Sequence, residues 1–371
     1  MQKMKLGWPK RKRLAKWHLT LGLFLGLIWS IQGLTGSLLV FHREWDQMGD
    51  DALTNGPMLH FSDMIEKIEE RIGVPVQRIT AVGRDPRLLE ARYLDKAGHP
   101  QAARIDAASG NIVGQRDREP TQPFGGAAWR WIYTVHTSLT VGPYGRIAMG
   151  LSGILLTSTL ILGLKLAWPK GGAWARTFQF RNLRTTVQKF YCWHRAFGSI
   201  AFCPLVVASL TGIYLVFDAP ITRTLSRMMP FQATAMMSHH GGMSGEHADH
   251  IMIGPDDAFD IARQRFPSGR FMNLEMPIEH PGYYSVRFTL PSELRAWSGR
   301  ALVQVSAMNG DILTVYNPSS TTPLNRFDDS IYPIHIGDAG GILHRLAIAI
   351  FGLSLPFFYC TGLFLWWRKR K

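Results

Sequence analysis

Apolar residues form four stretches that are each long enough to cross a lipid bilayer, at 17–42, 146–168, 190–217 and 343–367. A membrane-spanning helix needs about 20 predominantly apolar residues. Two polar blocks, 43–130 and 218–330, follow the first and the third stretch. The pattern predicts a membrane protein with four transmembrane helices, in which both polar blocks lie on the same side of the membrane.

The two polar blocks carry the same succession of short elements. In the first block, a helical pattern over 59–72 precedes strand-like runs at 76–82, 88–94, 102–105 and 112–113. In the second block, a helical pattern over 255–266 precedes strand-like runs at 271–276, 283–290, 301–305 and 311–315. Each block is therefore predicted to be a small α+β domain of one helix against a few antiparallel strands.

The chain contains an internal repeat. Residues 17–41 align with 193–217 without a gap, and both copies begin with Trp-His and contain Leu-Thr-Gly near their ends. Residues 132–168 align with 331–367 in the same way. Repeats of such long period indicate a repeated architecture. We therefore expect the four transmembrane helices to be arranged as two tandem repeats.

The net charge of +14 does not indicate a nucleic-acid binder. Sixteen of the 41 basic residues lie before Trp17, in the loop 168–189 and after Trp367, and none of these segments contains an acidic residue. The rest of the chain has 25 basic and 27 acidic residues. This asymmetry follows the positive-inside rule. Both termini and the middle loop are predicted to face the cytoplasm, and both polar blocks the outside, which in a bacterium is the periplasm.

Equivalent histidines are the main candidates for chemistry. His18 and His194 begin the first and third apolar stretches, and His136 and His335 precede the second and fourth. A pseudo-two-fold axis along the membrane normal would place the members of each pair opposite each other. Facing histidines in a helical bundle can supply both axial ligands of a haem. The alternative is an interfacial belt of aromatic and histidine side chains.

Other residues near the predicted outer face are weaker candidates. His42 and His344 have no histidine at their repeat-equivalent positions. Arg146 and Arg345 are equivalent to each other and could contact haem propionates, or could instead extend to lipid head groups. Glycines in the spans could face a haem or could only allow close helix packing.

The second block has an insert, 236–252, that the first block lacks and that contains methionines and histidines. These side chains are typical copper, iron or zinc ligands, so two interpretations stay open, a metal contact and a flexible linker; the candidate ligands are His239, His240, Met243, His247 and His250. All three cysteines lie in predicted spans, where we interpret them as small buried hydrophobic residues. No C-x-x-C-H motif for covalent haem attachment is present.

Several motifs together resemble the PepSY-associated transmembrane family. They are Trp193-His194-Arg195, Leu210-Thr211-Gly212, the turn at 106–111, Leu355-Pro356, and the closing Thr361-Gly362-Leu363 with Trp366-Trp367-Arg368. The resemblance covers nearly the whole chain. It implies that the two outer blocks are PepSY-like domains between transmembrane helices. The Met/His insert and His344 depart from the family's pattern.

The resemblance also implies a function. Family members of the ferrioxamine-reductase (FoxB) type are di-haem proteins of the bacterial inner membrane that reduce ferric siderophores in the periplasm. We therefore expect an oxidoreductase with two haem b groups, held by His18 with His194 and by His136 with His335. Electrons would come from quinol or a cytoplasmic reductase, since the chain has no nucleotide-binding fingerprint. The remaining partners would be membrane lipids and a ferric siderophore.

This interpretation divides the chain into seven segments: the N-terminus with the first span at 1–42, the first PepSY-like domain at 43–130, the outer histidine segment and second span at 131–168, a cytoplasmic loop at 169–189, the third span at 190–217, the second PepSY-like domain at 218–330, and the last histidine segment, fourth span and tail at 331–371. Three alternatives remain open. The protein could be a non-redox membrane protein that binds or transports metal, a membrane protein that regulates proteases, or a cupric reductase.

Overall fold

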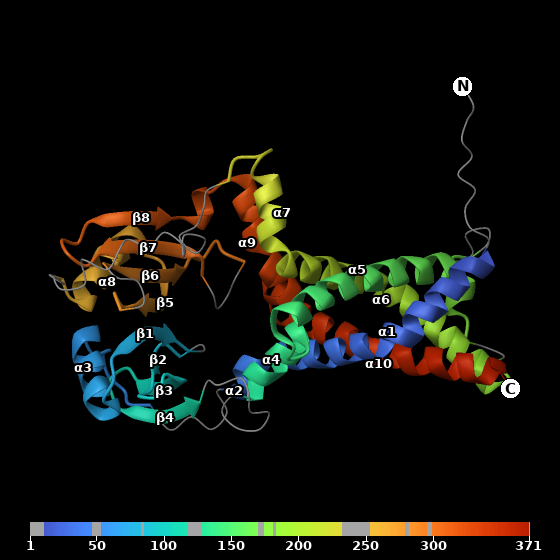
Figure 1. Ribbon diagram of the computed structural model, residues 1–371, viewed down its shortest axis with the longest axis horizontal. Coiled ribbons are helices and arrows are strands. Elements are labelled where there is room, and N and C mark those ends of the chain that lie inside the picture. Colours follow the sequence, from blue (N-terminus) through green and yellow to red (C-terminus); the bar gives the residue numbers. More distant parts are fainter. Residues whose placement is uncertain are drawn as a thin grey trace. The chain divides into compact units, whose positions relative to one another are not determined.

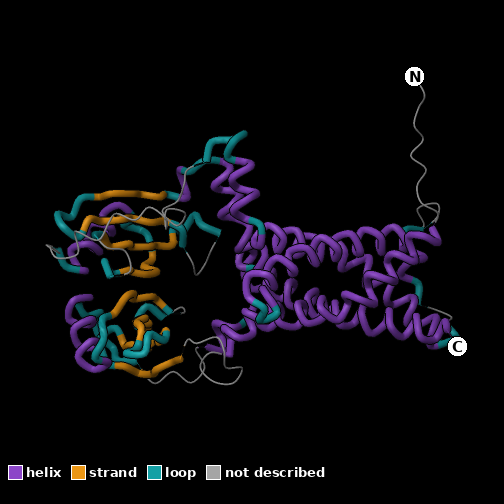
Figure 2. The backbone as a smooth tube through the Cα atoms, viewed as in Figure 1, coloured by secondary structure: helices purple, strands orange, loops and turns teal. Residues whose placement is uncertain are grey.

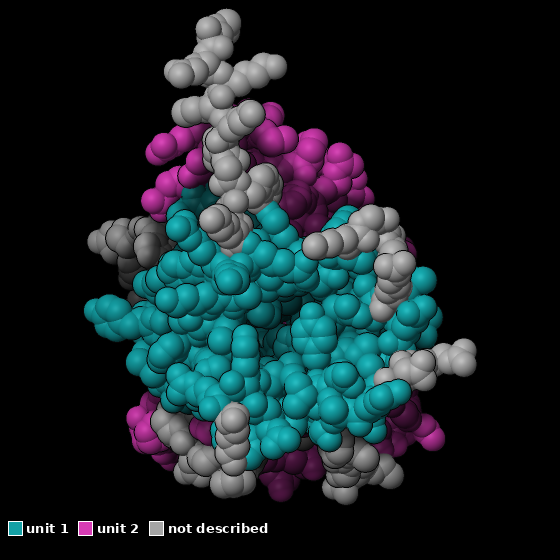
Figure 3. Space-filling model, turned by 90° about the vertical axis from the view of Figure 1, so that its right-hand side faces the viewer, with its two compact units in different colours: residues 1–40, 132–221, 334–371 teal, residues 41–131, 222–333 magenta. Residues whose placement is uncertain are grey.

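A computed structural model shows how the predicted elements are arranged. The structure describes residues 11–46, 53–82, 85–117, 128–169, 174–180, 183–231, 253–278, 282–294 and 299–370. The Met/His insert, with His239, His240, Met243, His247 and His250, lies outside the described residues. The chain divides into two compact units (Figure 3). We call 1–40, 132–221 and 334–371 the membrane unit, and 41–131 with 222–333 the sheet unit.

The membrane unit contains four helices that are long and apolar enough to cross a membrane. They are α1 (Arg11–Leu39), α5 (Gly142–Ala167), α6 (Thr186–Val216) and α10 (Gly341–Arg370) (Figure 1). The main contacts of α1 are with α10 and α5, and those of α6 are also with α5 and α10. Helices α1 and α6 are therefore diagonal to each other in the bundle. The expectation of four transmembrane helices is confirmed.

Small residues and helix caps position these spans. Gly33 on α1 packs so closely on Gly352 of α10 that a side chain at Gly33 would collide with the Gly352 carbonyl. Thr185 begins α6 with a capping box, in which its hydroxyl accepts from the Gln188 amide N–H. Helix α1 ends at Leu39 and a turn separates it from α2 (His42–Asp46), so His42 lies beyond the span.

Shorter helices precede or follow the spans. Helix α4 (Ala128–Ser138) leads into α5, and α9 (Pro323–Ile336) leads into α10 through a 3-10 turn at Asp338–Gly340. Helix α7 (Asp218–Leu225) follows α6, and a 3-10 segment (Trp174–Phe178) lies between α5 and α6. The last turns of α4 and α9 belong to the membrane unit and carry His136 and His335.

The sheet unit is built on one antiparallel sheet of eight strands (Figure 2). The strands are β1 (Val76–Ala81), β2 (Leu88–Leu94), β3 (Pro100–Asp106), β4 (Ile112–Asp117), β5 (Arg270–Glu275), β6 (Tyr283–Thr289), β7 (Ala301–Ser306) and β8 (Ile312–Tyr316). Their order is β4-β3-β2-β1-β5-β6-β7-β8. Each block forms a four-stranded meander, as its sequence pattern indicates.

The two blocks are joined at the pair β1–β5, where Ile79 lies opposite Leu274. The sequence predicts two small domains, whereas in the structure their first strands pair and form one sheet. The physical reason is that a first strand with no neighbour would expose a row of unpaired N–H and C=O groups. Each block covers that edge of the other.

Helices α3 (Phe61–Ile72) and α8 (Pro255–Arg265) contribute to a hydrophobic core shared by both blocks. Phe61 and Ile68 of the first block and Ala258 of the second are almost completely buried in it. Asp256 of α8 accepts the N–H groups of Phe61 and Ser62, at 2.6 and 2.9 Å, and so caps the start of α3. The blocks therefore share both a core and a helix cap.

Candidate functional site: two histidine pairs

The structure brings His18 and His194 together. His18 lies on α1 and His194 on the diagonal helix α6. The centres of their imidazole rings are 6.2 Å apart and the ring planes meet at 86°. Both rings are partly buried. The two residues occupy equivalent positions in the repeat and face each other across the bundle.

The structure also brings His136 and His335 together. These residues lie in the last turns of α4 and α9, and their ring centres are 6.3 Å apart with planes at 50°. Burial, followed by the charge of the nearby His136, lowers the pKa of His335 to about 4. Burial also lowers the pKa of His136. Both rings are therefore neutral near pH 7, which is the form that ligates a metal.

The ring separation equals that of two imidazoles that share one metal ion. A metal–histidine bond is about 2 Å long, and the ring centre lies about 1 Å behind the bonded nitrogen. Two such rings on opposite sides of one metal have centres about 6 Å apart. The observed 6.2 and 6.3 Å agree with this value in both pairs.

The Nδ1 atom of each ring is held by a helix of the membrane unit. The Nδ1 atoms of three histidines bond to threonine hydroxyls: His136 to Thr35 at 3.1 Å, His335 to Thr211 at 2.9 Å, and His194 to Thr361 at 2.8 Å. Nδ1 of His136 also lies 3.1 Å from the backbone carbonyl of Gln32. Nδ1 of His18 bonds to a backbone carbonyl, that of Thr159, at 3.0 Å.

These contacts determine the tautomer of the rings. The hydroxyls of Thr35, Thr211 and Thr361 each donate their proton to a carbonyl of their own helix, four residues earlier. Each hydroxyl therefore accepts a hydrogen bond from the histidine, which places the ring proton on Nδ1. The carbonyl at Thr159 has the same effect on His18. The lone pair of Nε2 stays available, as in metal sites where the second nitrogen is hydrogen-bonded.

A glycine lies against the Cε1 atom of every one of the four rings. A Cβ built at Gly36 would stand 2.9 Å from Cε1 of His136, one at Gly163 would stand 3.0 Å from His18, and one at Gly212 would stand 3.2 Å from His335. At Gly362 the corresponding distance to His194 is 3.7 Å, an ordinary contact. Three of these glycines directly follow the threonines that hold Nδ1. We call each threonine or carbonyl with its glycine a histidine seat.

The threonines were not among the site residues that sequence reasoning selected. The signal was present, because Thr35-Gly36 and Thr211-Gly212 are equivalent in the repeat and Thr361-Gly362 recurs near the end of the chain. Sequence alone did not show that these dipeptides lie beside histidines from other helices. The glycines were noted, but close packing and a ligand-facing role could not be distinguished. The structure separates the two roles, since Gly33 packs against Gly352 whereas Gly36 faces His136.

The two pairs lie at different levels of the bundle. His18 and Gly36 are both on the continuous helix α1, 18 residues apart. At 1.5 Å per residue, this separation is about 27 Å. The same spacing separates His194 from Gly212 on α6. One flat cofactor cannot contact both pairs over such a distance, so any cofactors would be two in number.

Arg146 and Arg345, which were predicted to lie near a cofactor, each donate to a carbonyl at the end of a helix. Arg345 is buried and donates to the Val40 carbonyl just beyond the end of α1. Arg146 is exposed, donates to the Leu215 carbonyl near the end of α6 at 2.8 Å, and lies 4.0 Å from Asp218. Both therefore satisfy carbonyls that a helix C-terminus leaves without a partner.

The two weaker histidine candidates do not join either pair. The ring of His42 lies in the sheet unit against Trp129, with ring centres 6.4 Å apart. His344 is partly buried at the start of α10, near Gly340. Within the described residues there is no group of three or more histidine, cysteine, aspartate or glutamate side chains that could hold a metal ion. The histidine pairs are thus the chemically notable clusters of the membrane unit.

Comparison with known families agrees with this architecture. The PepSY-associated TM region matches residues 15–369, which include all four spans and both halves of the sheet. No curated protein matches the chain at a significant level. Because the match covers nearly the whole length, this chain is a membrane protein that belongs to the PepSY-associated transmembrane family.

Proposed function

We propose that the protein is a di-haem reductase that carries electrons across the membrane to a ferric complex. The observation that supports this proposal best is the spacing of the two histidine pairs. Both have ring centres about 6 Å apart, and in both pairs Nδ1 is bonded while Nε2 is available. Packing alone does not require this arrangement twice at equivalent positions.

The residues present fit haem b. His18 with His194 would hold one group, and His136 with His335 the other. The glycines beside Cε1 leave each ring in contact with a helix backbone, which keeps its plane in place. Haem, when bound, supplies one-electron transfer at a potential set by its ligands and their hydrogen bonds. Arg345 and Arg146 are the guanidinium groups that would meet propionates.

The proposed substrate is a ferric siderophore, as in the reductases of this family type. Each iron takes up one electron, and Fe(III) becomes Fe(II), which siderophores hold far less well. The electrons would come from quinol or a cytoplasmic reductase. The basic segments at both termini and in the middle loop support cytoplasmic termini in a bacterial inner membrane, with the sheet unit in the periplasm.

The test uses the purified full-length protein. A b-type absorption spectrum is expected, and the reduced protein should be reoxidised by a ferric siderophore while a chelator traps Fe(II). His194→Ala should slow this reaction strongly. A colourless protein contradicts the proposal and favours a non-redox role in metal binding, transport or protease regulation. If cupric ions reoxidise the protein and ferric complexes do not, the substrate is copper.

A further inference from the structure

The sheet has a second face, opposite the one that packs against the shared core. Along β1, Ile79 points into the core, so its neighbours Arg78 and Thr80 point to the other face. Along β5, Leu274 is in the core, so Asn273 and Glu275 are on the other face. We call this the polar face of the sheet. Its centre is the β1–β5 seam that joins the two blocks.

Strand register places arginines next to one another on the polar face. Arg78 lies directly opposite Arg92 of β2 on one side and Glu275 of β5 on the other. In the neighbouring row, Thr80 lies opposite Asn273, which lies opposite Arg287 of β6. Like charges directly opposite each other destabilise a sheet. The pairing of Arg78 with Arg92 therefore calls for negative charge nearby.

Two glutamates supply part of that charge. Arg78 lies 3.1 Å from Glu275, and Arg92 lies 3.0 Å from Glu90. The arginine side chains remain 22% and 32% exposed, whereas the glutamates are only 8% and 9% exposed. Each guanidinium has five N–H donors in a planar fork, and a single carboxylate occupies at most two of them. Arg92 therefore has donors that can serve another acceptor besides Glu90.

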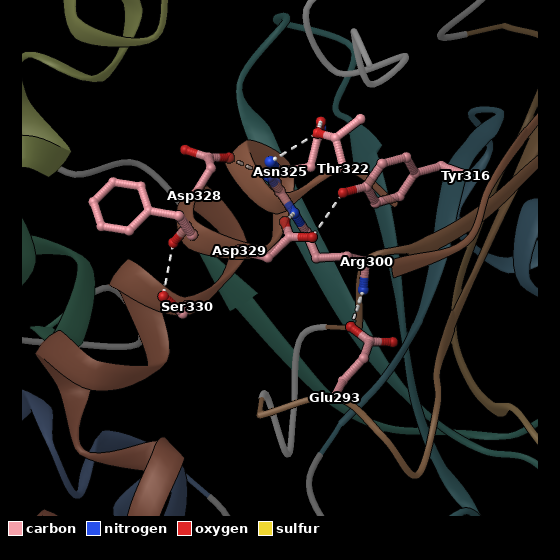
Figure 4. A network of polar contacts seen from close by, with 9 residues as sticks. Glu293, Arg300, Tyr316, Thr322, Asn325, Asp328, Asp329 and Ser330 are labelled. Carbon is pink, nitrogen blue, oxygen red and sulfur yellow. Dashed lines mark hydrogen bonds and ion pairs between the residues drawn. The ribbon is translucent and has the colours of Figure 1, made fainter. Parts of the chain in front are cut away.

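Arg287 has no carboxylate within ion-pair distance among the described residues. Burial lowers the pKa of its guanidinium. The charge of Glu275 raises this pKa, and the charges of Arg300 and Arg78 lower it. Arg300 itself is neutralised by Asp328 and Asp329 of α9 (Figure 4). Those two aspartates are thus engaged elsewhere. Among the described residues, the carboxylate whose charge favours the ionised form of Arg287 is the more distant Glu275.

Neutral groups of the same face also lack partners. Thr80 Oγ1, Asn273 Oδ1 and Thr289 Oγ1 are buried and have no hydrogen-bond partner in the described structure. Thr80 and Asn273 are opposite each other across the seam, and Thr289 is two residues from Arg287 on the same strand. Buried polar groups are nearly always hydrogen-bonded, so exceptions that gather in one place call for an explanation.

We propose that the polar face at the β1–β5 seam binds a small polycarboxylate anion. Arg287 and Arg92 would donate to its carboxylates through bidentate guanidinium contacts, and the side-chain N–H₂ group of Asn273 and the hydroxyl of Thr80 would donate to the same ligand. Arginine suits carboxylates because its fork matches their two oxygens. The binding itself is independent of haem. The identification of this anion with the carboxylate part of a ferric chelate rests on the proposed function.

The test is calorimetric titration of citrate into the full-length protein, without reductant. Wild-type protein should bind citrate, and Arg287→Gln should weaken binding about thirtyfold or more, the scale of losing one partner of a desolvated charge pair. Arg265→Gln is the matched control, since Arg265 is exposed in the last turn of α8. It should bind citrate like the wild type.

A second variant keeps the test decisive if Arg287→Gln fails to fold. Asn273→Asp places a carboxylate opposite Arg287, so it should raise the melting temperature and abolish citrate binding. Absence of citrate binding by the wild-type protein overturns the proposal, as does wild-type affinity in both variants. Because no electron transfer is measured, a failure of the di-haem proposal leaves this result interpretable.

Discussion

The two histidine pairs use nearly the same construction at two levels of one helical bundle. In each pair the ring centres are about 6 Å apart, each Nδ1 is bonded, and each Cε1 rests against a glycine. The difference lies in a single seat. Three seats hold Nδ1 with a threonine hydroxyl, and at His136 the Gln32 carbonyl lies equally near. His18 has the Thr159 carbonyl without such a hydroxyl, because Leu162, not threonine, precedes Gly163. What both pairs require is an acceptor for Nδ1 and room at Cε1, and more than one side chain can meet this requirement.

Removing a histidine should have the largest effect. His194→Ala takes one of two proposed axial ligands from its site, and a haem held by one bond in an apolar site loses orientation as well as affinity. Haem content should fall from about two to about one per chain. His335→Ala should produce the same loss at the other site. Full haem content in either variant contradicts the pairing, as does loss of both haems in each.

Removing a threonine hydroxyl should have the next largest effect. Thr211→Val keeps the shape of the side chain but leaves Nδ1–H of His335 without the hydroxyl at 2.9 Å. Changes to such partners typically weaken a metal site 10–100-fold. The measurement is the rate at which haem transfers to a haem-scavenging protein, together with the midpoint potential of the site.

Thr157→Val serves as the control for this variant. Thr157 is also a threonine of a span, but its hydroxyl bonds to the Gly153 carbonyl and to Ser209. It should retain haem like the wild type. If both valine variants behave alike, the hydroxyl at Thr211 has no particular role in holding His335.

Filling the space beside a ring should distinguish the seats from one another. Gly36→Ala places a Cβ 2.9 Å from Cε1 of His136, so the ring must move, whereas Gly362→Ala makes an ordinary contact of 3.7 Å with His194. Overpacking at the lower end of its usual cost, about 1 kcal/mol, corresponds to roughly fivefold weaker haem retention for Gly36→Ala. The matched variant Gly362→Ala should be unchanged. Equal effects of the two alanines would show that the glycine contacts do not position the rings.

Supplying the missing threonine should have the smallest effect. Leu162→Thr recreates the Thr-Gly dipeptide beside His18, but Nδ1 of His18 already bonds to the Thr159 carbonyl at 3.0 Å. Haem retention at this site should change by no more than about twofold, within the few tenths of a kcal/mol typical of a replaced hydrogen bond. A tenfold gain would mean that the carbonyl is a poor substitute for the hydroxyl.

Much of the fold could be predicted from the sequence because hydropathy and strand periodicity act locally. Helices α3 and α8 and the eight strands begin within two residues of the expected positions, and the four spans begin within six. The β1–β5 seam could not be predicted, since pairing between Ile79 and Leu274 joins strands far apart in the chain. The alternation of apolar and polar residues along a strand shows which residues share a face of the sheet. It does not show which other strand pairs with that strand.

The histidine pairs were predictable because the repeat marks His18 with His194 and His136 with His335 as equivalent. The residues around them were not. Whether Thr361 or Gly163 contacts a histidine depends on how α10 and α5 are rotated about their axes, which nearly uniform apolar stretches leave open. Arg146 and Arg345 illustrate the same limit, because equivalent positions lead to one exposed and one buried guanidinium.

The most direct test of this account is the number of haem groups in the purified full-length protein. The two pairs of rings at 6.2 and 6.3 Å predict about two b-type haems per chain, each with the spectrum of bis-histidine ligation. A haem assay combined with quantitative amino-acid analysis provides the ratio. A ratio near two supports both sites. Protein that incorporates no haem when expressed with an ample supply of it contradicts the account.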